Sequence, residues 1–440
     1  MRHEDSPRSE GHYRCVGVGA GPANLSLASL LHERPQVRNL FIDRKESFGW
    51  HDEQQIPGTT LQVSLFKDLV SLSEPTNPFS FLSYLHDKGR IYHFLNAQFS
   101  EVPRQEFRNY LAWAAERNKN VAFGEEVVEV GFDGVFRVRT DRRTVTADNI
   151  VVGVGSRPWV PDHGLRHLGA TQFHVNEYLA RAGNLGGKRV VVVGGGQSGA
   201  EAVLDLLSRS GAELPRRVAW ISRRRNFFPI DDSPFTNDFY TPSHSDYFYN
   251  LPADLRSAFN ARHVLSSDGI SESTLREVYQ RVYVLRFVEG RSDVVGLYPN
   301  REVADVTRSG PGTWDLEIRH NDGPADGVHF DADVIIWATG FRPAAMDFLA
   351  PLDGRLEREG DELRIDEHFA VQWDGPNDHN IFVQNAARQQ RGLPDPNLSL
   401  NAWRSRRIAD RLCGTRTGDQ LASFVAWSAK EESEVSWENR

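Results

Sequence analysis

The sequence predicts an α/β protein with two dinucleotide-binding (Rossmann-like) domains, the second inserted in the first. Two stretches, RCVGVGAGPANLSLASLL at 14–31 and KRVVVVGGGQSGAEAVLDLL at 188–207, each predict a buried strand, a glycine turn and a helix. Strand patterns at 331–343 and 380–384 follow the second stretch, as expected if the chain returns to its first domain. The 440 residues are enough for two or three domains.

The first glycine stretch predicts a cradle for a dinucleotide. Gly17, Gly19 and Gly21 let the backbone turn and approach a pyrophosphate, and Pro22 suits the first turn of a helix because it has no N–H. A second apolar run ends in Asp43, at the distance where an acid accepts the ribose hydroxyls of an adenosine. The alternative is an ordinary strand-turn-helix with a glycine-rich bend.

The second glycine stretch matches the complete G-x-G-x-x-G pattern with Gly194, Gly196 and Gly199. The next strand pattern is followed by Arg223 and Arg224, where an NAD site would carry an acid. A guanidinium pairs bidentately with phosphate, so these arginines favour the 2′-phosphate of NADP. The alternative is a solvated basic turn.

Composition and charge exclude several classes of protein. The 51 basic and 60 acidic residues give a net charge of −9, so no broad basic surface invites nucleic acid or anionic lipid. The two cysteines, Cys15 and Cys413, make neither a disulfide framework, a zinc site nor a C-x-x-C pair. The chain has no long apolar run and no secretory signal pattern. We expect a cytoplasmic protein with no metal site, no nucleic-acid partner and no membrane attachment.

The segments between the two motifs predict further elements. Residues 48–90 predict turns and short helices, an insertion of the kind that reaches over a bound cofactor. Within it, Lys67 either snorkels from an apolar surface or points its charge into a pocket. Helices are predicted at 106–118 and 397–412, the second with its start aimed at a cofactor. The aromatic segment from 226 onwards is either core under loops or the wall of a ligand pocket.

Two dinucleotide stretches, the first with an acid and the second with arginines, predict FAD in the outer parts of the chain and NADPH in the middle. Such a flavoprotein takes hydride from NADPH, and oxygen is the leading acceptor because a disulfide reductase needs a cysteine pair that this chain lacks. The predicted limits are 1–12 for a disordered tail, 13–180 for the first part of the FAD domain, 181–330 for the NADPH domain with a substrate-binding segment at 226–290, 331–415 for the second part of the FAD domain, and 416–440 for a peripheral tail.

The sequence resembles a known family, the microbial N-hydroxylating monooxygenases of siderophore biosynthesis, which include lysine N6-hydroxylases and ornithine N5-hydroxylases. The resemblance runs from about residue 13 to residue 414. Its specific motifs are GVGAGPANLSL, LQVSLFKDLVSLSEPTNPFSFLSYL, GKRVVVVGGGQSGAE, the NDFYTP segment, ATGFRP and PNLSLNAWRSRRI. Together they are far more specific than either glycine stretch.

The resemblance implies roles for residues around the reaction. Gln62 and Lys67 match a pair beside the flavin and substrate, where the glutamine lies near the reactive ring and the lysine contacts a substrate carboxylate. Asn237 matches an asparagine that binds the α-amino end of the substrate. Phe239 and Tyr283 are placed with the substrate-binding residues in the same way.

The resemblance also extends the cofactor sites. Gln197 and Ser198 fall in the loop under the NADPH pyrophosphate, and Thr339 and Gly340 in a strand-end motif at the cofactors. The segment along the flavin is formed by Leu398, Ser399 and Leu400. His174 and Tyr178 resemble, with imperfect spacing, an inter-domain linker motif of related flavin monooxygenases.

The implied reaction converts a terminal primary amine to its N-hydroxy product with O₂, through a C4a-hydroperoxyflavin. Segment 281–283 stands where the ornithine branch carries threonine, asparagine and tyrosine, which disfavours ornithine. RIYHFLNAQF at 90–99 is most similar to the diamine-acting relatives, so we expect putrescine or cadaverine, with L-lysine as the alternative. Lys67 argues the other way, because a diamine has no carboxylate.

A Baeyer-Villiger or sulfur-oxidising flavin monooxygenase shares both glycine stretches and is a further alternative. A flavin-dependent sensor or inactive scaffold is the non-enzymatic alternative. The resemblance implies a homo-oligomer, either a dimer or a tetramer.

Overall fold

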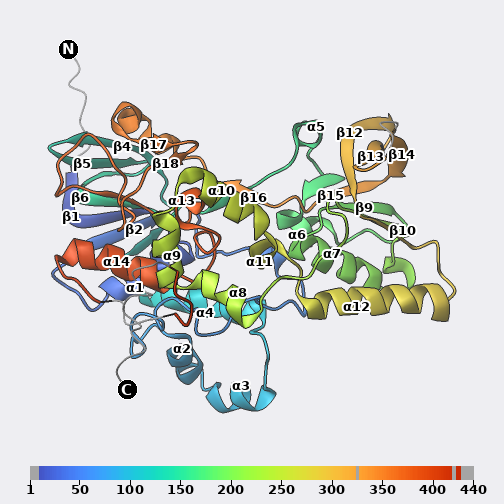
Figure 1. Cartoon of the computed structure of the whole chain (residues 1–440), viewed down its shortest axis with the longest axis horizontal. Coiled ribbons are helices and arrows are strands. Elements are labelled where there is room, and N and C mark those ends of the chain that lie inside the picture. The colour runs from blue at the N-terminus through green and yellow to red at the C-terminus, as the bar shows by residue number, and fades with distance from the viewer. Residues whose placement is uncertain (1–8, 324–326, 419–422, 428–440) are drawn as a thin grey trace.

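The computed structural model describes residues 9–323, 327–418 and 423–427. Two α/β halves lie side by side along the long axis of the molecule (Figure 1), each built on its own sheet. This arrangement confirms the predicted fold of two Rossmann-type domains.

The first sheet has the order β3-β2-β1-β6-β5-β4, with β19 pairing with β6. Its central strand is β1, which runs parallel to β2 and β6. The apolar run that predicted this strand is buried, since Cys15 and Val16 have no exposed surface. The strands are β1 (Ser9–Val18), β2 (Asn39–Asp43), β3 (Val121–Phe123), β4 (Val127–Asp133), β5 (Val135–Thr140), β6 (Thr144–Val152) and β19 (Ile381–Val383).

The second sheet is parallel throughout, in the order β11-β10-β9-β15-β8. A valine run forms β9 because a strand covered on both faces is apolar along its whole length. The strands are β8 (Gln172–His174), β9 (Arg189–Val193), β10 (Arg217–Ile221), β11 (Val295–Tyr298) and β15 (Val334–Trp337).

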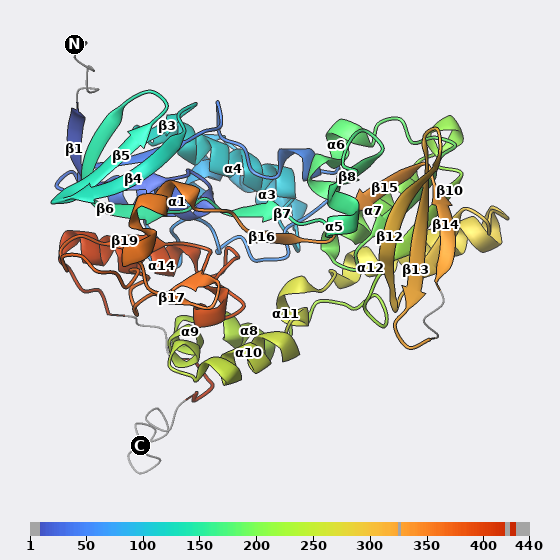
Figure 2. The same cartoon turned by 90° about the horizontal axis from the view of Figure 1, so that it is seen from above.

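The predicted domain limits at 180 and 330 are wrong. β8 pairs with β15 and β15 pairs with β9, so segments that we had assigned to the two parts of the FAD domain complete the second sheet. The chain passes between the halves at β7 (Ser156–Pro158) and β16 (Phe341–Pro343), which pair antiparallel and lie between the two sheets (Figure 2). These crossings mark the real limits of the inserted domain.

An antiparallel meander completes the second half at its outer end (Figure 2). It consists of β12 (Arg301–Gly310), β13 (Thr313–His320) and β14 (Val328–Ala332). Trp314 and Leu316 of this meander are buried against Ile335 and Trp337 of β15, so it shares a core with the second sheet.

Helices cover both sheets. The first half carries α1 (Pro22–Leu31), α2 (Phe81–Asp87), α3 (Ile91–Ala97), α4 (Arg104–Arg117), α13 (Arg388–Arg391) and α14 (Asn401–Cys413). The second half carries α5 (Asp162–Leu165), α6 (Tyr178–Arg181), α7 (Gln197–Ser208) and α12 (Glu272–Tyr283), which continues as a π-helix at Val284–Val288. The expected helix at 397–412 begins at Asn401, later than predicted. None of the helices in the described ranges is long and apolar enough to cross a membrane.

The segment that we expected to bind substrate divides between the two halves. Its short helices are α8 (Pro234–Asn237), α9 (Pro242–Tyr249), α10 (Ala253–Arg262) and α11 (Leu265–Asp268). Asp246 of α9 forms ion pairs with Arg391 and Arg407, which anchor α9 to the first half. α12, which follows, packs on α7 in the second half.

Two predictions concern the chain ends, and the one for the N-terminal end is wrong in part. The tail predicted at 1–12 is wrong for residues 9–12, because β1 begins at Ser9 and His12 Nε2 lies 3.0 Å from Asp148 Oδ1. Residues 1–8 lie outside the described ranges. Of the peripheral tail predicted at 416–440, only residues 416–418 and 423–427 are described, and they form no helix or strand.

Candidate functional site

The first glycine loop joins β1 to α1. Gly19 has a φ of +88°, a left-handed conformation that favours glycine, and a Cβ on Gly17 would lie 2.1 Å from the ring of Phe41. Gly21 caps α1 and Pro22 begins it, while a Cβ on Gly21 would meet no atom within 4 Å. The open space above Gly21 and the helix start behind it fit a bound pyrophosphate.

Asp43 lies at the end of β2, beside this loop, as predicted. One carboxylate oxygen accepts a hydrogen bond from Ala20 N at 2.8 Å and the other accepts one from Lys45 N at 2.9 Å. Each carboxylate oxygen can accept further bonds, so Asp43 can hold the loop and still accept from a ribose hydroxyl.

A series of hydrogen-bonded, buried polar side chains lies beneath the loop and was not predicted from the sequence. Asn24 donates from Nδ2 to Gly19 O at 2.7 Å, and its Oδ1 accepts from Gln384 Nε2 at 2.8 Å. Arg404 donates to Gln384 Oε1 and pairs at 3.0 Å with Asp395, and both charged side chains are almost fully buried. These residues join the two parts of the first half under the loop. Polar residues inside an apolar helix pattern were the available signal.

The segment at Leu398, Ser399 and Leu400 lies just before α14, which is tied to the loop by a hydrogen bond of 2.9 Å from Asn401 Nδ2 to Pro22 O. Ser399 is 2% exposed, and its hydroxyl has no hydrogen-bond partner in the described parts of the chain. Buried hydroxyls are normally bonded, so this orphaned group fits a partner on a bound cofactor. The first glycine loop and the 398–400 segment, both predicted to contact FAD, therefore lie close together.

The second glycine loop repeats the design between β9 and α7. Gly194 has a φ of +137°, and a Cβ there would lie 2.0 Å from Ala338 O. A Cβ on Gly199 would lie 2.4 Å from Gly194 O, so the helix packs against the loop only without a side chain. Gly196 caps α7, and the half-buried Ser198 lies in its first turn. This geometry fits a second dinucleotide.

The two arginines predicted to select NADPH differ in their surroundings. Arg223 is exposed, whereas Arg224 Nη1 donates to Gly195 O at 3.1 Å and to Asp268 O at 2.8 Å. Burial lowers the pKa of the Arg224 guanidinium. Arg224 therefore braces the loop backbone, whereas the side chain of Arg223 is exposed and accessible to a ligand.

Thr339 and Gly340 lie at the end of β15, beside the second glycine loop and before the crossing strand β16. The Thr339 hydroxyl donates to Trp159 O, and Gly340 has a φ of +89°. His174 Nε2 lies 3.1 Å from Gly340 O, so the residue of the expected linker motif contacts the chain crossing. The hydroxyl of the other motif residue, Tyr178, donates to Asp205 at 2.6 Å inside the second half.

Gln62 of the first half meets Gln197 of the second. Its Nε2 lies 3.4 Å from Gln197 Oε1 and 3.3 Å from Gly269 O. Ser271 N donates to the same Gln197 oxygen at 2.8 Å. The two sequence-predicted glutamines, 135 positions apart, therefore stand together where the halves face each other.

Lys67 is half-buried, with its ammonium 5.5 Å from the centre of the Tyr240 ring. Burial lowers the pKa of this ammonium. Among the described residues, no carboxylate lies within ion-pair distance of it. The Tyr240 hydroxyl donates to Ser266 O at 2.6 Å, which fixes the ring. Tyr240 was not among the predicted site residues, although it belongs to the NDFYTP motif.

The other predicted substrate residues lie in different surroundings. Asn237 is exposed at the end of α8 and donates to Asp232 O at 2.7 Å. Phe239 packs in an aromatic cluster with His244, Phe259 and His263, at 4.9 to 5.0 Å between ring centres.

The structure does not bring Tyr283 to these residues. It ends α12, one helix length beyond Ser271, is 55% exposed and contacts Phe287. Arg281 beside it bonds to Leu207 O and Glu289. The sequence correspondence that disfavoured ornithine therefore concerns the outer end of α12.

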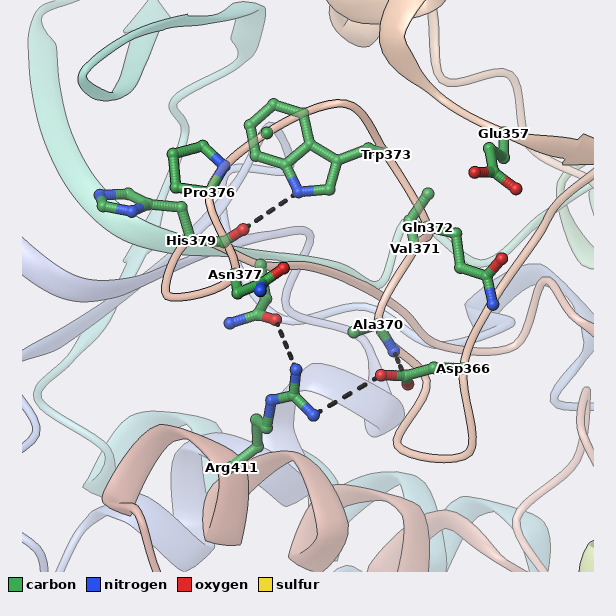
Figure 3. Close-up of a pocket in the computed structure, with 12 residues that line it drawn as sticks. Glu357, Asp366, Ala370, Val371, Gln372, Trp373, Pro376, Asn377, His379 and Arg411 are labelled. Carbon is green, nitrogen blue, oxygen red and sulfur yellow. Dashed lines mark hydrogen bonds and ion pairs between the residues drawn. The ribbon is translucent and has the colours of Figure 1, made fainter.

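A cavity of about 270 Å³ lies elsewhere in the first half and holds none of the predicted residues (Figure 3). Arg411 points into it from α14 and contacts Asn380 and Asp366. The described ranges contain no group of three or more metal-ligating side chains.

Comparisons with known proteins agree with this geometry. The profile of the family described as L-lysine 6-monooxygenase/L-ornithine 5-monooxygenase matches residues 11–343. The L-lysine N6-monooxygenase of Escherichia coli is 37% identical over 404 residues, which cover 91% of this chain and 94% of that protein. The rhizobactin siderophore biosynthesis protein RhbE of Rhizobium meliloti is 34% identical, covering 91% of each chain.

A solved structure shows the same fold with a cofactor. The FAD-bound DfoA of Erwinia amylovora, the cadaverine monooxygenase of the desferrioxamine biosynthetic pathway, superposes with a TM-score of 0.88 at 27% identity. The superposition covers 95% of this chain and 98% of that one. The expected cofactors, FAD and NADPH, are confirmed by solved structures of the family, which hold FAD and NADP⁺.

Proposed function

We propose, from the premise that this chain belongs to the L-lysine 6-monooxygenase/L-ornithine 5-monooxygenase family, that its substrate is L-lysine, hydroxylated at the terminal amine. The coarser activity follows from the family: the protein is an NADPH-dependent flavin N-monooxygenase of siderophore biosynthesis. The choice of amine rests on Lys67.

Lys67 supports an amine that carries a carboxylate. Its ammonium is half-buried beside Tyr240, and none of the described acidic side chains pairs with it. A partly buried charge without an anionic partner is costly, and a substrate carboxylate compensates for that cost on binding. A diamine would instead bring the ammonium at its far end near the ammonium of Lys67, and the repulsion between the two like charges is unfavourable.

The reaction needs both cofactors and a neutral amine. The first glycine loop and the 398–400 segment would hold the flavin, which supplies oxygen activation when it is bound and has been reduced by NADPH. Gln62 and Gln197 lie where the halves that hold the two cofactors meet. The reacting amine has an ordinary pKa of about 10.4, so the site must favour its neutral form through desolvation.

Cadaverine is the second candidate, because the superposition with the cadaverine monooxygenase covers nearly the whole chain. The segment that favoured a diamine in the sequence, residues 90–99, includes α3, in which no side chain is buried. That resemblance therefore adds no buried side chain to the site.

We further propose that the enzyme is a cytoplasmic homo-oligomer. Sedimentation of the purified protein tests its oligomeric state.

The test measures the rates of hydroxylamine formation and of NADPH consumption over a range of concentrations of L-lysine, cadaverine, putrescine and L-ornithine. L-Lysine is expected to give the highest kcat/KM. A higher kcat/KM for either diamine or for L-ornithine would overturn the choice of L-lysine. If NADPH consumption gave peroxide and no hydroxylamine with all four amines, the result would contradict hydroxylation of these amines altogether.

A further inference from the structure

A buried ion pair joins the two halves of the molecule. Arg104 begins α4 in the first half, and Glu201 lies on α7 in the second (Figure 1). The guanidinium forms two parallel contacts with the carboxylate, of 2.6 and 2.8 Å. The side chains are 15% and 5% exposed, so this pair is shielded from solvent and salt.

Arg104 also holds the insertion that carries the flavin-side glutamine. Its Nη2 donates to Thr60 O at 3.2 Å, and its Nη1 lies 3.5 Å from Gln54 O. Arg104 N donates to Thr59 O at 3.0 Å. The same side chain thus fixes the backbone just before Gln62 and the helix of the opposite half.

Glu201 is also connected to the second glycine loop, through a hydrogen bond from Gln197. Gln197, one turn earlier on α7, donates from Nε2 to Glu201 Oε1 at 2.9 Å. The amide oxygen of Gln197 faces Gln62 and accepts from Ser271 N. The pair therefore closes a ring of contacts that runs from Arg104 through Glu201 and Gln197 to Gln62 and back along the insertion.

We propose that Arg104 and Glu201 are positioning residues that set the NADPH loop against the flavin side of the site. Neither residue needs to touch a cofactor in this role. Flavin reduction depends on the placement of the two cofactors, and small misplacements of reacting groups cost large factors in rate. The inference rests on the two-cofactor reaction of the family and is independent of which amine is hydroxylated.

The test is the rate of flavin reduction by saturating NADPH, measured anaerobically without amine in FAD-loaded enzyme. Glu201→Gln keeps the shape of the side chain but removes its charge, and we expect it to slow this step about tenfold to a hundredfold. Reduction of the same FAD by dithionite should proceed as in the unaltered enzyme, because it needs no placement of NADPH. Arg104→Gln should behave in the same way.

The matched control is the pair Arg90–Glu106, 2.8 Å apart and within the first half. Arg90→Gln should leave the NADPH-driven rate within about twofold of the unaltered rate, since the Arg90–Glu106 pair is exposed.

In the charge exchange Arg104→Glu with Glu201→Arg, we expect a faster NADPH-driven rate than in either single variant. The proposal is overturned if Glu201→Gln reduces its flavin at the unaltered rate. It is equally overturned if NADPH and dithionite reduction slow together, or if the charge exchange gives no recovery. Because no amine is present, these outcomes are separate from the substrate proposal.

Discussion

The ammonium nitrogen of Lys67 lies 5.5 Å from the centre of the Tyr240 ring, a contact between the insertion of the first half and the segment before α9. A cation so placed is held by the ring but keeps its capacity to donate to a carboxylate. Lys67 is therefore oriented before substrate arrives.

Lys67→Met removes the charge and keeps an apolar stem of similar length. A hydrogen bond to a charged group contributes about 1.5–3 kcal/mol, so the KM for L-lysine should rise about tenfold or more. The KM for cadaverine, which has no carboxylate, should stay within about twofold. Steady-state kinetics with both amines measures this, with the exposed Lys88→Met as control. Equal increases for both amines would contradict a carboxylate contact.

The pH dependence of binding should report the same residue. Burial lowers the pKa of Lys67 below its ordinary 10.5, so its ammonium is lost at a lower pH than that of a free lysine side chain. As pH rises through this lowered pKa, the ratio of the KM for L-lysine to that for cadaverine should increase. The ratio of the two substrates cancels effects that they share. A ratio that rises equally in Lys67→Met would mean that another group titrates.

The sequence predicted the two loops because their requirements are local. Gly19 needs a left-handed backbone and Gly17 a gap beside Phe41, and both needs appear as glycines at fixed spacing. Asp43 could be placed because the first strand-helix-strand unit has a standard length. The domain limits failed because the pairing of β15 with β8 and β9 joins segments far apart in the chain.

The site between the halves was less predictable. Phe239 and Tyr240 are adjacent aromatic residues, and only packing shows that Tyr240 lies by Lys67 while Phe239 joins a cluster with His244. The ion pair of Arg104 with Glu201 spans 97 positions and carries no local signal. Side-chain contacts across a domain interface depend on how the domains dock, which periodicity does not report.

Two glycines of the first loop should separate folding from FAD binding. A Cβ on Gly17 would overlap the ring of Phe41, so Gly17→Ala should destabilise the protein by about 1–3 kcal/mol. A Cβ on Gly21 would enter open space, so Gly21→Ala should fold normally but bind FAD weakly. Chemical unfolding of the apoprotein and titration with FAD measure the two effects. Normal FAD affinity in Gly21→Ala would show that the cofactor does not cross this point.

Substitutions of Arg223 and Arg224 should separate the preference for NADPH over NADH from the structure of the second glycine loop. Arg223→Gln removes the exposed guanidinium, so the KM for NADPH should rise about tenfold or more while that for NADH is unchanged. Arg224→Gln removes the bonds to Gly195 O and Asp268 O, so both KM values should rise. The two variants serve as controls for each other. Selective loss of NADPH in Arg224→Gln alone would reverse these roles.

His244 should make stability depend on pH. Burial lowers its pKa from 6.5 to about 4, so the folded protein keeps this imidazole neutral while the unfolded chain protonates it. Below pH 6.5 the unfolded state binds more protons, so stability falls with pH until the folded state also protonates near pH 4. At pH 5 the loss relative to pH 8 is about 2 kcal/mol for this one group.

The measurement is the free energy of unfolding in denaturant at pH 8 and pH 5. His244→Leu should lose less stability between these two pH values than the unaltered protein, by about the same 2 kcal/mol. His263, whose pKa burial also lowers, remains in the variant and keeps part of the dependence. The control is His93→Gln, at an exposed histidine whose side chain forms no hydrogen bond or ion pair within the described ranges, and it should leave the difference unchanged. An identical pH difference in His244→Leu would show that His244 is protonated equally in the folded and unfolded states.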